Sequence, residues 1–128
     1  VLVLVSAYLW YQARLAAGPA IPFEELPIAT QEIIINDIEM GHKSIDAGDW
    51  DGASRYFMNA YDLHPRNPEV EVGLERVRDM VIERAAGMTN LRQKEYLLKL
   101  VDAYSEHEFF ANDEQMRALR EQLRAEVD

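Results

Sequence analysis

The stretch Ile38–Pro65, IEMGHKSIDAGDWDGASRYFMNAYDLHP, decides how this chain folds. It contains two helix-length segments separated by Gly48 and Asp49, residue types that end one helix and begin the next. Small residues recur in it at spacings that allow two helix backbones to approach closely. Phe57 is large enough to fill the space between the helices, and Pro65 ends the second one. The stretch therefore predicts a two-helix hairpin built for stacking.

Six residues of this stretch fall on the small, aromatic and proline signature positions of a repeat that recurs every ~34 residues. These residues are Gly41, Gly48, Ala53, Phe57, Ala60 and Pro65. At these six positions, the segment from about residue 34 to 67 resembles one unit of the tetratricopeptide repeat (TPR) family. The resemblance implies a helical module that binds other proteins and is not a catalyst. The signature does not recur one period later, at Glu75, Ile82, Gly87, Leu91, Lys94 and Lys99.

Composition sets the outer limits of the interpretation. The chain has 128 residues, 48% of them hydrophobic, which is enough for one domain with a core. It has no cysteine, so disulfides, thiolate zinc sites, iron–sulfur clusters and cysteine nucleophiles are excluded. Its formal net charge of −10 argues against a nucleic-acid partner, because phosphate contacts require cations.

The negative charge is concentrated in one half of the chain. Residues 24–75 contain twelve acidic and three basic side chains, whereas residues 76–128 contain eleven acidic and nine basic ones. The acidic half is either a solvated face or a surface that attracts a basic segment of a partner.

The first residues predict a membrane anchor. Val1–Gln12 contains no charge, and a helix of this length reaches ~18 Å, short of the ~30 Å hydrocarbon core. Because the chain begins with Val and not Met, we expect upstream residues to complete the span. We interpret residues 1–16 as the end of a transmembrane helix, with Trp10, Tyr11 and Arg14 at the membrane interface. A buried soluble helix and a retained signal-peptide core are the alternatives.

The sequence after this segment indicates the side of the membrane. Arg14 is the last basic residue before Lys43, and cytoplasmic flanks usually carry an excess of Lys and Arg. We therefore expect a single-pass protein whose soluble part lies outside the cytoplasm, in the periplasm if the source is bacterial.

Residues 17–29 predict a spacer. Prolines at positions 19, 22 and 27 prevent a continuous helix and favour an extended, fairly stiff chain. The segment also contains Ile21, Phe23, Leu26 and Ile28, so it either docks on the repeat or runs free.

Helical periodicity predicts an all-α domain over residues 30–128. The expected helices cover residues 30–47 and 50–63, then 68 to about 87, about 90–106, and the chain from 112 onward. Asn67 and Pro68 are an N-cap and a first-turn proline, and Asn112 with Gln115 forms a capping box. We expect the third helix to cap the TPR-like hairpin. The last two form either a further, degenerate hairpin or part of an interface with a neighbouring protein.

Catalytic signals are missing from the sequence. His42, His64 and His107 are the only histidines, and no two have the spacing that places metal ligands on one helix face. There is no phosphate-binding glycine loop and no nucleophile elbow, and no pair of carboxylates is placed to converge. We therefore predict no catalytic, cofactor-binding or metal-binding residue, no small-molecule substrate and no enzyme activity.

The TPR resemblance also implies a binding groove, because the first helix of each unit lines the concave face of such proteins. It assigns the groove to Ile35, Ile38, His42, Ile45 and Asp46. Ile38 and His42 replace the lysine and asparagine with which some family members bind acidic chaperone termini, so that activity is not supported. An apolar or amphipathic segment, with a basic group near Asp46, suits this surface better. Alternatively, the chain's own spacer or fourth helix covers these isoleucines.

Three functions are compatible with these features. The first is a membrane-anchored scaffold or adaptor for other proteins, as an accessory subunit of a larger membrane assembly. The second is the extracytoplasmic sensory or regulatory domain of a longer signalling enzyme, such as a receptor kinase. The third is a tethered receptor for basic targeting peptides, as in organelle import.

Overall fold

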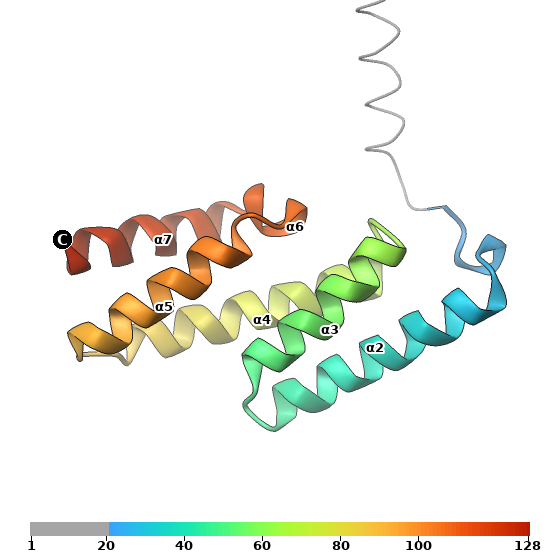
Figure 1. The fold of residues 1–128 in the computed structure, drawn as a ribbon, viewed down its shortest axis with the longest axis horizontal. Helices are drawn as coiled ribbons and strands as arrows, with labels where there is room; N and C mark the ends of the chain where they lie inside the picture. The colour runs from blue at the N-terminus through green and yellow to red at the C-terminus, as the bar shows by residue number, and fades with distance from the viewer. Residues whose placement is uncertain (1–20) are drawn as a thin grey trace, which may run out of the picture.

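The computed structural model describes residues 21–128, and helices are the only regular secondary structure in this part of the chain, which has no strands. The predicted all-α fold is therefore confirmed for these residues. The elements are the 3-10 helix η1 (Phe23–Glu25) and the α-helices α2 (Ile28–Asp46), α3 (Trp50–Leu63), α4 (Pro68–Ala86), α5 (Leu91–Tyr104), α6 (Glu108–Ala111) and α7 (Glu114–Val127). In Figure 1, α2 and α3 form a hairpin, α4 lies along it, and α5 and α7 pair at the other end of the molecule.

The predicted membrane anchor at residues 1–16, with Trp10, Tyr11 and Arg14, lies outside the described residues. No helix in the described part is both long and apolar enough to cross a bilayer.

The first hairpin has the boundaries that its sequence predicts. Gly48 adopts the left-handed conformation (φ 80°), which ends the turn after α2 without the steric penalty of a side chain. Asp49 then caps α3, since its Oδ1 accepts a hydrogen bond from the Gly52 amide at 2.9 Å. Helix α3 begins at Trp50 and ends at Leu63, as expected, and α2 begins two residues earlier than expected.

Phe57 is the centre of the packing between three helices. Its side chain is fully buried, and a Cβ atom on Gly41 of α2 would lie 2.5 Å from its Cζ. A Cβ atom on Gly73 of α4 would lie even closer to the same ring. The ring thus packs directly against a glycine of α2 and a glycine of α4. The sequence predicted that Phe57 fills the space between the two hairpin helices, but it did not indicate the packing against Gly73.

The third helix follows its sequence signals closely. Asn67 accepts hydrogen bonds from the Glu69 and Val70 amides, and Pro68 occupies the first turn. The helix ends at Ala86 with Gly87 as its C-cap. The predicted N-cap and the predicted end near Gly87 are therefore confirmed.

The prediction of a capping box at Asn112 is wrong. The last helix begins two residues later and is capped by Asp113, whose Oδ1 accepts from the Met116 amide at 2.8 Å. Asn112 instead donates from Nδ2 to the Glu108 carbonyl, across a short helix, α6, that the sequence did not predict. Burial of Phe110 against the core holds this single turn in place.

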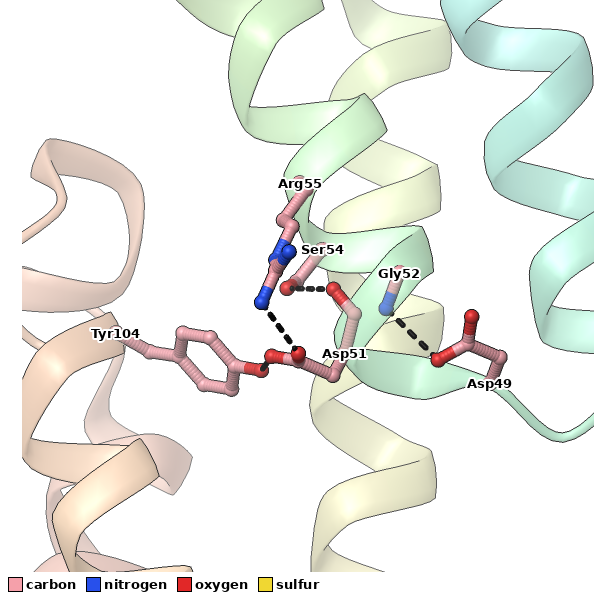
Figure 2. A network of polar contacts seen from close by, with 6 residues as sticks. All are labelled: Asp49, Asp51, Gly52, Ser54, Arg55 and Tyr104. Carbon is pink, nitrogen blue, oxygen red and sulfur yellow. Dashed lines mark hydrogen bonds and ion pairs between the residues drawn. The ribbon is translucent and has the colours of Figure 1, made fainter.

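The second hairpin is attached to the first by polar contacts between distant residues. Figure 2 shows Tyr104 of α5 donating its hydroxyl proton to Asp51 in the first turn of α3. Asp51 also pairs with Arg55 at 3.1 Å. A second contact joins α4 to the residue before α7, where Arg78 pairs with Asp113 at 2.8 Å and both side chains are largely buried. Burial and the hydrogen bond to Asp51 raise the pKa of Tyr104 above its ordinary value.

We predict that Gly41→Ala and Gly73→Ala each destabilise the fold by about 1–3 kcal/mol, although alanine has the higher helix propensity. The Phe57 ring cannot retreat from one added methyl group without meeting the other helix. The matched control is Gly87→Ala, whose Cβ would meet nothing nearer than the Arg84 carbonyl at 3.8 Å. Urea unfolding measures the effect, and equal stability of all three variants would contradict the packing assigned to Phe57.

We predict that the stabilisation provided by Tyr104 is lost in alkaline solution. Because the pKa of Tyr104 is raised in the folded state, this stabilisation is complete below the unfolded value near pH ~10 and declines above it. The difference in unfolding free energy between the natural chain and Tyr104→Phe should fall by at most about 1.4 kcal/mol per pH unit above pH ~10. Urea unfolding between pH 8 and 11 tests this, and a constant difference would refute it.

Candidate protein-binding groove

One face of α2 presents apolar side chains to solvent. Ile28 and Ile35 are seven residues apart, so they share a side of the helix, and Ile38 lies next to them. His42, a further seven residues along, is half-buried. Ile28 is 74% exposed and Ile35 56% exposed, whereas Ile38 is half-buried. A neighbouring side of α2 faces the core with Ile34. The exposed isoleucines are therefore not used in packing the core.

A cavity of about 700 Å³ lies beside this face of α2. Its volume is in the ~300–1,000 Å³ range typical of binding pockets. Ile35 and Ile38 form one wall, and the residues before α2 form a second. The remaining lining comes from the connection between α3 and α4. The residues outside α2 are Ile21, Pro22, Phe23, His64, Arg66, Asn67, Pro68 and Glu69. We use the name groove for this cavity together with the exposed face of α2.

Hydrogen bonds to a buried histidine fix the second wall. His64 is 4% exposed, and its Nε2 lies 2.6 Å from the Ile21 carbonyl oxygen. Its Nδ1 lies 3.0 Å from Nδ2 of Asn67. An amide nitrogen can only donate, so His64 Nδ1 is the acceptor and Nε2 carries the proton that is donated to Ile21. The His64 ring thus links Asn67, which caps α4, to Ile21, the first residue of the second wall.

The spacer therefore docks on the domain from residue 21 onward and is not extended throughout. Phe23 to Glu25 form a 3-10 turn, and Phe23 and Leu26 pack against the core. Gln31 donates from Nε2 to the Leu26 carbonyl at 2.8 Å, which ties the end of the spacer to α2. The apolar residues of the spacer offset the cost of ordering it, and this explains the departure from an extended chain.

The five groove residues predicted from the resemblance do not all lie at this surface. Ile35 and Ile38 line the cavity. The spacer stands beside Ile35 and leaves it exposed. Ile45 is 8% exposed and belongs to the core, so we leave it out of the proposed groove.

His42 and Asp46 are joined by a residue that the sequence did not single out. Arg76 of α4 places Nη1 2.7 Å from His42 Nδ1 and Nη2 3.6 Å from Asp46 Oδ1. The His42 ring also packs edge-on against Phe57, with 5.0 Å between the ring centroids. The basic group that was expected from a partner near Asp46 is therefore present in the chain itself.

Further groove residues come from outside α2. Ile21 and Phe23 contribute apolar surface from the spacer, and Pro68 contributes it from the first turn of α4. Periodicity identifies these residues only as members of a helix or a linker. Their position beside α2 depends on how α4 and the spacer pack, which no local pattern specifies.

The lining of the groove is mainly apolar, and its ionisable side chains are His64, Arg66 and Glu69. Within residues 21–128, no three His, Asp or Glu side chains converge in a way that could hold a metal ion. His107 accepts from the Phe109 amide and contacts Asp62 at 3.2 Å, far along the chain from His42 and His64. The arrangement can bind an apolar segment with polar groups at its edges.

No family model matches the sequence, and no curated protein or solved structure matches the chain. The TPR resemblance therefore depends on the signature residues and on the helices described above.

We predict that Asn67→Ala costs more than an ordinary N-cap deletion. Asn90 is the matched control, because it caps α5 with the same two types of bond, to the Arg92 and Gln93 amides. Asn90→Ala should cost about 1 kcal/mol. Asn67→Ala should cost about 1 kcal/mol more, since it also leaves His64 without its donor.

Hydrogen exchange provides the second measurement. In Asn67→Ala the amide of Leu26, which bonds to the Phe23 carbonyl, should exchange faster than in Asn90→Ala. Equal exchange in both variants would show that the spacer does not depend on the His64 link.

Proposed function

We propose that this chain is a membrane-anchored, TPR-like scaffold whose groove binds an apolar or amphipathic segment of another protein. The observation that supports this most directly is the row of exposed isoleucines beside a preformed cavity. Contiguous exposed apolar surface next to a concavity is typical of interaction sites. We further propose that the protein is an accessory subunit of a larger membrane assembly and has no catalytic activity.

The packing of the first three helices supports the TPR-like part of the proposal. The small signature residue Gly41 admits the aromatic signature residue Phe57, which is the role that the resemblance implies for both. Helices α2 and α4 pack against each other and both contribute to the groove, as the first helices of successive repeats would.

The energetics favour a segment with apolar side chains on one face. Burying an exposed isoleucine contributes about 1.5–3 kcal/mol, and Ile28 and Ile35 are both available. An amphipathic helix placed along α2 would present its own apolar residues at three- and four-residue spacing. Arg66 and Glu69 at the cavity provide one charge of each sign for orienting the segment.

The spacer connects the groove to the proposed anchor. Only residues 17–20 separate the predicted anchor, residues 1–16, from Ile21, which His64 holds against the domain. Four residues span at most about 14 Å. In the proposed arrangement the groove therefore stays close to the bilayer, where a membrane-proximal segment of a partner can reach it. We place the domain outside the cytoplasm because basic residues are scarce after the anchor.

We predict that Ile35→Glu abolishes capture of the partner from solubilised membranes, because it places a charge in the apolar wall of the groove. Ile33→Glu is the matched control, since Ile33 is 49% exposed on the same helix but does not line the cavity. Full-length chain is used as bait, and circular dichroism confirms equal helix content.

If both variants lose capture equally, or if both retain it, the proposal that the groove binds the partner is wrong. Retention of capture between 50 and 500 mM salt is expected for an apolar segment. A steep loss with salt would instead favour the receptor for basic targeting peptides.

A further inference from the structure

A second cavity, of about 790 Å³, lies at the other end of α4 and shares no lining residue with the groove. Its lining residues come from the turn between α2 and α3, the C-terminal half of α4 and the first half of α5. These elements are labelled in Figure 1. Its apolar wall is formed by Trp50, Met80, Met88 and Leu97, with the exposed ring of Tyr96 at one side. We call this cavity the α4–α5 cleft.

The cleft is open because two helix connections leave space unfilled. Gly48 and Gly87 both line it. A Cβ atom on Gly48 would meet nothing within 4 Å, and one on Gly87 only the Arg84 carbonyl at 3.8 Å. Trp50 packs edge-on against Tyr104, with 6.0 Å between the ring centroids, so its side of the cleft is held in position. The cleft is therefore a preformed concavity with an apolar floor.

The charges of the cleft are unusual for this protein. Among residues 21–128, eight of the twelve Lys and Arg side chains pair with a carboxylate. Arg84 and Arg92 are two of the four that pair with none, and both line the cleft. The other two, Lys99 and Arg117, lie outside it. Glu83 is the one carboxylate in the lining, and it forms no ion pair with either arginine.

Two guanidinium groups without carboxylate partners, next to apolar side chains, indicate a ligand that has both an anionic and an apolar part. In a chain with a net charge of −10, carboxylates are abundant, yet none neutralises these two arginines. Arginine binds carboxylates through two parallel hydrogen bonds, and methionine side chains adapt to flexible apolar chains. The mixed lining, with apolar side chains beside the two arginines, fits a small free anion that carries an apolar chain.

We propose that the α4–α5 cleft binds a single-chain amphiphilic anion, an apolar tail with one carboxylate head, as in a medium-chain fatty acid. The tail lies against Met80, Met88 and Leu97, and the head lies between Arg84 and Arg92. The cavity volume is within the range of small-molecule sites. This binding site is independent of the proposed groove.

Laurate, titrated below the concentration at which it forms micelles, tests the proposal. Trp10→Phe in the full-length chain leaves Trp50 as the sole tryptophan, so its fluorescence reports directly on the cleft. We expect a saturable change with one site per chain. Arg84→Gln combined with Arg92→Gln should raise the Kd by tenfold to a hundredfold, as expected for lost charge-assisted hydrogen bonds. Dodecanol, which has the same tail without the charge, should bind at least tenfold more weakly.

The matched control is Lys99→Gln combined with Arg117→Gln, which removes the same charge from outside the cleft and should leave the Kd unchanged. Ile35→Glu should also leave it unchanged, so failure of the groove and failure of the cleft are distinguishable. The proposal is overturned if laurate gives no saturable change, if dodecanol binds as well, or if both double variants weaken binding equally. Sedimentation without laurate provides a further check. A dimer that depends on Arg84 and Arg92 would assign the cleft to a second copy of the chain and overturn the proposal.

Discussion

The packing of Phe57 against two glycines is the interaction on which the rest of the structure depends. The ring is fully buried, and neither Gly41 nor Gly73 has room for a methyl group beside it. Because the ring touches α2 and α4 at once, it sets the separation of these helices as well as the packing of α3 between them. Helix α4 then has a fixed position along the first hairpin. The Arg76 bridge to His42 and Asp46 joins the same two helices.

The position of α4 in turn creates both concave surfaces. Its first residues, with the Asn67 cap, contribute to the groove, and its last two turns contribute to the α4–α5 cleft. The second hairpin does not fill the cleft, because α5 is attached to α3 through Tyr104 at its far end. Two cavities of similar volume thus arise at opposite ends of one helix, and they differ in charge. The groove contains one charge of each sign, whereas the cleft contains two arginines without carboxylate partners.

Local sequence signals predicted the fold where the information is local, and failed where it depends on packing. Gly48 and Asp49 fixed the start of α3, and Asn67 with Pro68 fixed the start of α4, since each acts on adjacent backbone groups. At the last helix, Asn112 and Asp113 are both good caps. The choice of Asp113 follows from α6, whose single turn is stabilised by tertiary burial and has no periodic signature.

The candidate site was less predictable than the fold for the same reason. A helix has several apolar sides, and periodicity alone does not say which of them its neighbours cover. The resemblance assigned both Ile45 and Ile35 to the groove, yet Ile45 is buried and Ile35 is exposed, because α3 and α4 pack on only one flank of α2. The spacer adds a second constraint. His64, itself held by the cap of α4, bonds to the Ile21 carbonyl, so the spacer forms a wall of the groove without covering Ile35. In the proposed scaffold, the same hydrogen bonds therefore determine both the shape of the binding surface and its distance from the membrane.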